Sequence, residues 1–114
     1  PDVFGRLASF SPSLGWAGAG PLAMVAARER PPVRLYVDMG TRERGNLRDG
    51  DGNGTDDAID DLRALREALL RRGFSEGSDL LVVEDEGARH HESYWARRFP
   101  AAARFLFPGP VVRR

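Results

Sequence analysis

The chain has 114 residues, of which 41% are hydrophobic, so it is large enough for at most one domain. Its 17 basic and 17 acidic residues balance, and no excess of positive charge predicts binding to nucleic acid or to an anionic membrane. The chain has no cysteine, which excludes disulfides, thiolate metal sites and cysteine nucleophiles, and no apolar run approaches the roughly 20 residues of a membrane-spanning helix. We therefore expect a soluble, cytoplasmic protein without a bound cofactor.

The predicted elements alternate between strand and helix along the chain. Runs of apolar and β-branched residues predict three strands, at residues 7–10, 33–38 and 80–83. Apolar residues at helical spacing predict helices at residues 21–28 and 58–72, with a further helical stretch after residue 92. This order favours an α/β fold of three layers, in which a parallel sheet carries helices on its faces.

The last helical stretch contains a proline. Trp95 and Phe99 share its apolar face, and we expect both to pack in the core. Pro100 should break or kink the helix near Phe99, so we expect two short helical pieces.

The predicted sheet is small for an independent domain. The continuous apolar run at residues 80–83 is typical of a strand with neighbours on both sides. The chain begins at Pro1 in the middle of a pattern and without an initiator methionine, so we expect a cut or a processing point there. Residues 1–114 are thus expected to form a single partial domain, the C-terminal part of a larger sheet, whose exposed edges favour self-association.

Polar residues follow each predicted strand. In parallel α/β sheets, functional groups gather in the loops at the carboxyl ends of the strands. In chain order these loops carry Ser11 and Ser13, then Asp38, Arg42 and Glu43, then Asp85, His90 and His91. An acid after one strand and a histidine after the next is the order of the second half of an α/β-hydrolase triad, in which the nucleophile comes first.

Three stretches of the sequence resemble one esterase family. They are PDVFGRLASFSPSLGW, LYVDMGTRE and DLLVVEDEGARHHESYWARRFPAAARFLF. They are similar to the segment after the nucleophile helix, the acid-bearing strand and loop, and the closing strand, histidine loop and last helix of the α/β-hydrolase family that includes esterase D and the enterochelin esterase-like enzymes. The similarity spans nearly the whole chain apart from the acidic loop.

The resemblance implies a serine carboxylic-ester hydrolase that acts on a small-molecule ester through an acyl-enzyme. It assigns the general base to His90 and the acid to Glu43, which follows a Gly-Thr-x pattern, with Asp38 and Asp85 as alternatives. No serine of the chain stands in a G-x-S-x-G elbow, and the family's elbow and oxyanion-hole donors precede the point where Pro1 begins. The chain is therefore expected to supply the acid and the histidine, but not the nucleophile.

Without the resemblance, the same residues leave other roles open. A His-His pair in a polar loop is often solvated or caps the following helix. Glu43 then becomes an exposed loop carboxylate beside Arg42, and Asp38 a strand-end residue that accepts backbone hydrogen bonds. A non-catalytic hydrolase-fold domain that binds partners is the alternative function.

Two further features are candidates for binding. Trp16 follows the first strand and is the candidate wall of a substrate pocket. Residues 44–55 form a polar, glycine-rich loop that we interpret as an insertion, and its end resembles a calcium loop of the EF-hand type, with Asp49, Asp51, Asn53, Gly54 and Asp60 at positions 1, 3, 5, 6 and 12. The match is partial, because position 8 is Asp56 instead of an apolar residue and position 12 is not glutamate. We therefore expect no bound metal and keep a small calcium-binding module as a third hypothesis, against a loop whose aspartates cap the next helix.

Overall fold

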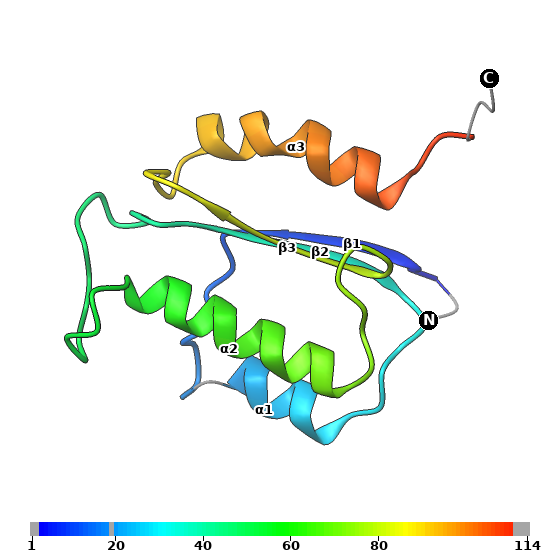
Figure 1. Ribbon diagram of the computed structural model, residues 1–114, viewed down its shortest axis with the longest axis horizontal. Coiled ribbons are helices and arrows are strands. Elements are labelled where there is room, and N and C mark those ends of the chain that lie inside the picture. Colours follow the sequence, from blue (N-terminus) through cyan, green and yellow to red (C-terminus); the bar gives the residue numbers. More distant parts are fainter. Residues whose placement is uncertain (1–2, 19, 111–114) are drawn as a thin grey trace.

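The computed structural model describes residues 3–18 and 20–110, so the expected cut point at Pro1 lies outside the described residues. Strands and helices alternate in the order β1 (Arg6–Phe10), α1 (Gly20–Ala27), β2 (Arg34–Gly40), α2 (Asp57–Arg71), β3 (Leu80–Asp85) and α3 (Glu92–Leu106). They form three layers, with α1 and α2 on one face of the sheet and α3 on the other (Figure 1). The predicted α/β fold is confirmed, and the three strands and first two helices lie within two residues of their expected bounds.

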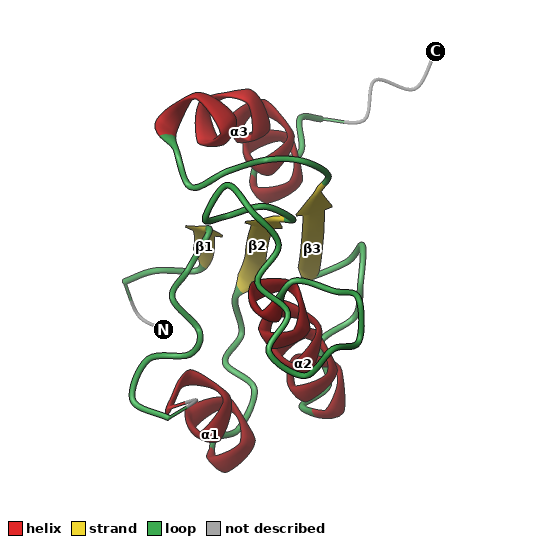
Figure 2. Ribbon diagram, turned by 90° about the vertical axis from the view of Figure 1, so that its left-hand side faces the viewer, coloured by secondary structure: helices red, strands yellow, loops and turns green. Residues whose placement is uncertain are grey.

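The three strands are parallel and stand in the order β1-β2-β3. Phe10 is level with Asp38, and Gly40 is level with Asp85, so the strands end at the same edge of the sheet. Figure 2 shows the arrows side by side, pointing the same way, with loops crossing over their tips. Side chains from three separate loops therefore meet at this edge, as parallel α/β topology requires.

The core has one layer on each face of β2. On the α1 and α2 side, Val37 and Met39 pack against α2, whose buried residues are Ile59, Leu62, Leu65 and Leu69. On the other side, Tyr36 packs against Ala102 and Leu106 of α3. The side chains of β2 thus alternate between the two layers, as strand geometry dictates.

The loop before α2 ends in an N-cap. The carboxylate of Asp56 accepts a hydrogen bond from the backbone N–H of Ala58 at 3.0 Å, which satisfies one of the free amides of the first helical turn. After α2, Gly73 takes a φ of 96°, in the left-handed region that commonly ends a helix. Asp56 and Gly73 therefore mark the two ends of α2.

α3 is one continuous helix, so the expected break at Pro100 is wrong. A proline inside a helix removes the hydrogen bond to the carbonyl of the residue four positions earlier, here Ala96. Both Pro100 and Ala96 are exposed, so water can take the place of that bond. Residues on both sides of the proline, Arg98 and Leu106, are buried against the sheet and hold the two halves in line.

The buried face of α3 also differs from the expected one. Phe99 is 60% exposed, so the expectation that it packs in the core is wrong, and Trp95 is half-buried. The buried face carries Arg98, Ala102 and Leu106, at i, i+4 and i+8 spacing. A charged residue therefore occupies a position in the interface between α3 and the sheet.

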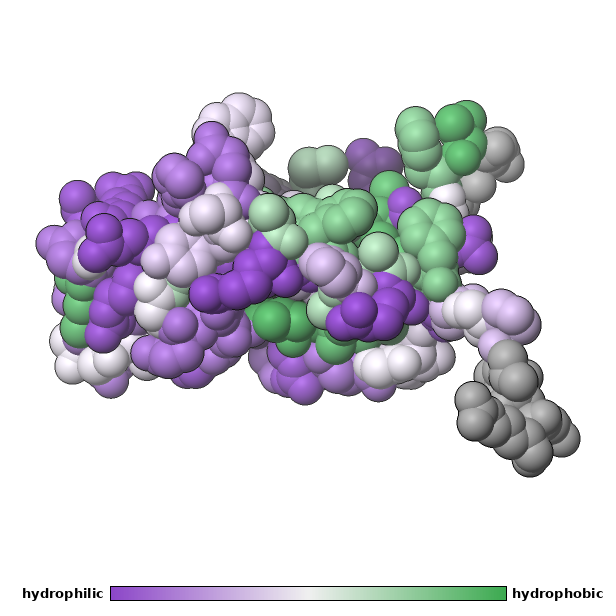
Figure 3. All heavy atoms as spheres, turned by 90° about the horizontal axis from the view of Figure 1, so that it is seen from above, coloured by the Kyte–Doolittle hydropathy of each residue, from purple (hydrophilic) through white to green (hydrophobic). Residues whose placement is uncertain are grey.

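One sheet edge and part of the α3 face are apolar. β1 is an edge strand among the described residues, and large exposed hydrophobic residues include Phe4, Leu7, Phe99 and Phe107. Seen from the α3 side, hydrophobic residues gather toward the centre and right of the molecule, whereas the left is mostly hydrophilic (Figure 3). Self-association through such an edge stays a prediction. No helix within the described ranges is long and apolar enough to cross a membrane.

Candidate active site

The loops after β2 and β3 are joined backbone to backbone. Arg42 donates its N–H to the carbonyl of Ala88 at 3.0 Å, and His90 donates its N–H to the carbonyl of Glu43 at 3.0 Å. Gly40 permits this approach, because a Cβ at its position would lie 2.2 Å from the carbonyl oxygen of Ala88. The loop contacts place the predicted acid and the predicted base in adjacent positions.

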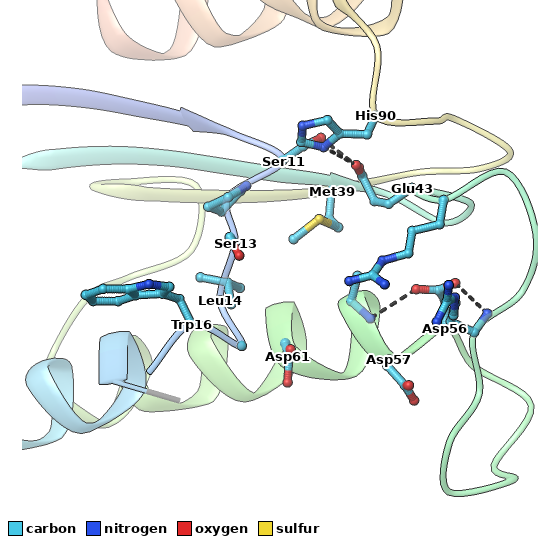
Figure 4. A pocket seen from close by; sticks show the side chains of 15 residues that line it. Ser11, Ser13, Leu14, Trp16, Met39, Glu43, Asp56, Asp57, Asp61 and His90 are labelled. Atoms are coloured by element: carbon cyan, nitrogen blue, oxygen red, sulfur yellow. Dashed lines mark hydrogen bonds and ion pairs between the residues drawn. The ribbon is translucent and has the colours of Figure 1, made fainter. Parts of the chain in front are cut away.

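The side chains of Glu43 and His90 form a hydrogen-bonded pair. Glu43 Oε2 lies 2.8 Å from His90 Nδ1 (Figure 4). The other carboxylate oxygen, Oε1, accepts hydrogen bonds from the Ser11 hydroxyl at 2.7 Å and from the Gly40 N–H at 2.5 Å. The ring of Trp95 stands edge-on to the imidazole, with centroids 5.0 Å apart and an interplanar angle of 86°. Contacts from Ser11 after β1, from Gly40 of β2 and from Trp95 of α3 therefore fix the orientation of the pair.

The pair has one buried and one exposed end. The Glu43 side chain is 8% exposed and that of His90 56% exposed. An ionised carboxylate can only accept, so a neutral His90 carries its proton on Nδ1 and presents a bare lone pair at Nε2. Among residues 3–18 and 20–110, no hydrogen-bond partner faces Nε2. This arrangement has the orientation of the acid and general base in a serine hydrolase triad.

Asp38, an alternative acid, is engaged in a buried ion pair. Its side chain is fully buried, and Arg98 binds it with two hydrogen bonds, at 2.8 and 3.0 Å. The Tyr36 hydroxyl and the Ser11 N–H donate the other two bonds, at 2.8 and 3.0 Å. Burial, together with this hydrogen bond to Asp38, raises the pKa of Tyr36 above its ordinary value. The structure therefore does not bring Asp38 to His90.

Asp85, the second alternative acid, binds two arginines of α3. Arg97 contacts both of its oxygens, at 3.0 and 2.9 Å, and Arg98 contacts one, at 3.1 Å. Burial alone would raise the pKa of Asp85, but these two guanidinium groups hold it below its usual range. Of the three candidate acids, the structure brings only Glu43 to His90.

The second histidine has a separate position. His91 is the N-cap of α3, and its Nδ1 accepts the backbone N–H of Ser93 at 3.2 Å. The capping role considered for the His-His pair thus falls to His91, while His90 faces Glu43.

A cavity of about 730 Å³ opens beside the pair. Its lining combines Ser11, Ser13, Leu14, Trp16, Met39, Glu43 and His90 with the charged residues Arg44, Arg48, Asp57 and Asp61 (Figure 4). Trp16 lines this cavity and is 72% exposed, and its contact with a substrate stays a prediction. Partial burial and the charges of Asp57 and Asp60 raise the pKa of Asp61. The volume is that of a typical small-molecule pocket.

The calcium-like loop satisfies its own polar groups. Asp49 accepts the backbone N–H groups of Asn53 and Gly54 at 3.0 and 2.8 Å, and the bond from Gly54 is the first cause of its lowered pKa. The side-chain oxygen of Asn53, which would face a cation, accepts the N–H of Thr55 at 2.8 Å. The Asn53 amide group donates to Asp60 at 2.9 Å. These contacts describe a hydrogen-bonded polar loop.

The carboxylates that do cluster form a different set from the predicted one. One oxygen from each of Asp49, Asp51 and Asp57 lies within 4.8 Å of the others. Asp57 was not among the predicted ligands, and the predicted ligand Asp60 is not in this set. Exposed acidic groups of this kind occur often without a metal.

Sequence reasoning placed Ser11 in the polar loops without a role, and missed Trp95 and Arg98 as parts of the site. The three side chains meet at the Ser11 hydroxyl oxygen, which lies 3.2 Å from Trp95 Nε1 and 3.0 Å from Arg98 Nη2. One signal was present in the sequence, because Arg98 stands on the same helical stripe as Ala102 and Leu106. A charged residue on a buried stripe needs an opposite charge in the fold.

Comparison with known proteins adds one relative. No family model matches the chain, and no solved structure matches it. The chain is similar to the uncharacterized protein YbbA of Bacillus subtilis (strain 168), with 22% identity over 107 residues, covering 94% of this chain and 41% of YbbA. The chain thus spans about two fifths of the length of the curated relative it matches.

Proposed function

We propose that Glu43 and His90 are the acid and the general base of a serine carboxylic-ester hydrolase, whose nucleophilic serine is supplied by a part of the protein outside these 114 residues. The observation that carries the proposal is the 2.8 Å contact between Glu43 Oε2 and His90 Nδ1, with Nε2 left as a free acceptor beside a cavity. A buried acid joined to an exposed imidazole is the geometry that the reaction requires.

The proposed reaction proceeds by acyl transfer. His90 Nε2 takes the proton of the serine hydroxyl as its oxygen attacks the ester carbonyl, and the same nitrogen then protonates the departing alkoxide. Water, deprotonated by Nε2 in turn, hydrolyses the acyl-enzyme and releases the acid. Glu43 holds the tautomer and stabilises the imidazolium that forms in both steps.

The substrate in this proposal is a small-molecule ester. The cavity of about 730 Å³ has room for one, and its wall offers both an exposed aromatic face, Trp16, and several charged groups. The acyl and alcohol groups would be bound in part by residues beyond this chain.

The test is to express the complete reading frame that encodes this chain and to measure p-nitrophenyl ester hydrolysis and labelling by a fluorophosphonate. We expect one labelled serine, and a loss of kcat of about 10⁴-fold or more in His90→Ala. His91→Ala is the matched control and should keep most of the activity, because the contacts of His91 are with the first turn of α3 and not with Glu43.

The acids are separated in the same assay. Glu43→Gln should lower kcat by about 10⁴-fold. Asp38→Asn and Asp85→Asn should act mainly on stability, because both carboxylates are bound to arginines. Absence of labelling and turnover in a folded parent protein would refute the hydrolase and favour the alternative, a non-catalytic domain that keeps the hydrolase fold and binds a partner.

A further inference from the structure

The hydroxyl of Ser11 sits at the centre of the contacts around Glu43. Ser11 is the first residue after β1 and is buried. Its Oγ lies 2.7 Å from Glu43 Oε1, 3.2 Å from Trp95 Nε1 and 3.0 Å from Arg98 Nη2. The oxygen therefore contacts three polar groups from three different parts of the fold.

The chemistry of these three partners sets the direction of the hydroxyl proton. The indole of Trp95 and the guanidinium of Arg98 can only donate, so Ser11 Oγ must accept from both. Both of its lone pairs are then used, and its single hydrogen is left to point at Glu43 Oε1.

This orientation determines which carboxylate oxygen His90 meets. Glu43 Oε1 receives the Ser11 hydroxyl and the Gly40 N–H, and so has two donors. Oε2 is the oxygen left for His90 Nδ1. A carboxylate held in this way favours the imidazole tautomer with its proton on Nδ1, which leaves Nε2 as an acceptor.

The backbone of Ser11 supports the same conclusion. Its φ is 46°, in the left-handed region that favours glycine. A glycine would adopt this conformation without strain, so what the serine adds at this position is its hydroxyl. The N–H of the residue is also bound, to the carbonyl and the carboxylate of Asp38, both at 3.0 Å.

We propose that Ser11 is a positioning residue that orients the Glu43 carboxylate and thereby holds His90 in the Nδ1–H tautomer. The consequence for turnover rests on the proposed function. The tautomer itself is a property of this chain and can be measured without any reaction.

The experiment is a long-range ¹H–¹⁵N NMR correlation at about pH 8.5, above the usual titration range of imidazole, on the ¹⁵N-histidine-labelled protein expressed from the complete reading frame. The wild-type chain should show His90 mainly as the Nδ1–H form. The matched variant is Ser11→Gly, which removes the hydroxyl and relieves the left-handed backbone, and it should lower the ratio of Nδ1–H to Nε2–H by about fivefold, the typical net effect of one hydrogen bond. His91 is the internal reference, because its Nδ1 accepts from Ser93 and should stay unprotonated in both proteins.

An unchanged ratio at His90 in folded Ser11→Gly would overturn the proposal. If that variant does not fold, Ser11→Ala takes its place, since it removes the same hydroxyl and leaves the Trp95 ring against His90. A lowered ratio in Ser11→Ala supports the proposal, and a wild-type ratio overturns it.

Failure of this inference is distinguishable from failure of the proposed function. A shifted tautomer in a protein whose parent hydrolyses no ester would leave the positioning role intact and remove the hydrolase. A parent enzyme that loses turnover in His90→Ala, together with an unshifted tautomer in Ser11→Gly, would remove the positioning role alone.

Discussion

Replacing Arg98 by alanine should strongly destabilise this chain, because it breaks a buried ion pair. The side chain donates to Asp38 at 2.8 and 3.0 Å, to Asp85 at 3.1 Å and to Ser11 Oγ at 3.0 Å. After the change, the fully buried Asp38 keeps only two neutral donors, the Tyr36 hydroxyl and the Ser11 N–H. Removing one partner of a buried ion pair costs about 3–5 kcal/mol, because the remaining charge stays buried without compensation.

That loss is a large share of the roughly 5–15 kcal/mol that stabilises a typical domain. At roughly 4 °C per kcal/mol for a chain of this size, it lowers the melting temperature by about 12–20 °C. Urea unfolding at pH 7, followed by circular dichroism, measures the free energy of unfolding directly.

Two further variants separate the buried charge from other effects. Arg97→Ala is the control, because Arg97 neighbours Arg98, forms its ion pair with Asp85 and is 59% exposed, and it should cost less than about 1 kcal/mol. The double variant Asp38→Asn with Arg98→Met removes both charges and should recover at least half of the loss. A loss below about 1 kcal/mol in Arg98→Ala would refute the argument that Arg98 compensates the buried carboxylate of Asp38.

Three more predictions concern the loops at the carboxyl ends of the strands. Gly40→Ala should lower the free energy of unfolding by about 1–3 kcal/mol, because the new Cβ would overlap the carbonyl of Ala88, whereas Gly5→Ala, with open space around it, should change it by less than about 0.5 kcal/mol. Asp61 has a raised pKa, so the folded state loses stability as pH rises through the pKa of Asp61 in the folded protein. Asp61→Asn should therefore be more stable than wild type at pH 7 and equal to it below about pH 3.5. A difference in stability that does not depend on pH would contradict this. Asp85 has a lowered pKa, so its contribution is complete above about pH 4 and disappears as pH falls through the folded value; thermal melts of Asp85→Asn should therefore fall below wild type at pH 7, by a margin that shrinks in acid.

Much of the fold follows from local pattern. The apolar stripe of α2, its Asp56 cap and Gly73 stop, and the β-branched run of β2 each specify an element from neighbouring residues alone. Because the elements alternate, the strands are parallel, and their loops meet at one edge. The sequence pattern therefore predicts that the candidate loops lie together at the carboxyl edge of the sheet, as the paired strand ends show.

The incorrect predictions are those in which a long-range contact overrides a local rule of helix structure. Pro100 breaks an isolated helix, but α3 continues because the buried Arg98 and Leu106 bind the sheet on both sides of the proline. Phe99 was assigned to the core by its apolar character, and the structure gives the inward position to Arg98 instead. Arg98 forms an ion pair with Asp38, 60 residues away in sequence. This ion pair outweighs the hydrophobic preference for Phe99 on the buried face of α3.

The sequence by itself determined the order of the elements, the edge where the polar loops meet and the succession of acid and histidine along the chain, because these depend on periodicity, turn residues and topology. The tertiary structure decided which acid faces His90. Asp38 and Asp85 are bound by arginines of α3, and Glu43, whose Oε1 is held by Ser11 and Gly40, is left to pair with the imidazole. The physical reason is that each carboxylate is compensated by the donors nearest to it in space, and those donors come from segments that the sequence keeps far apart.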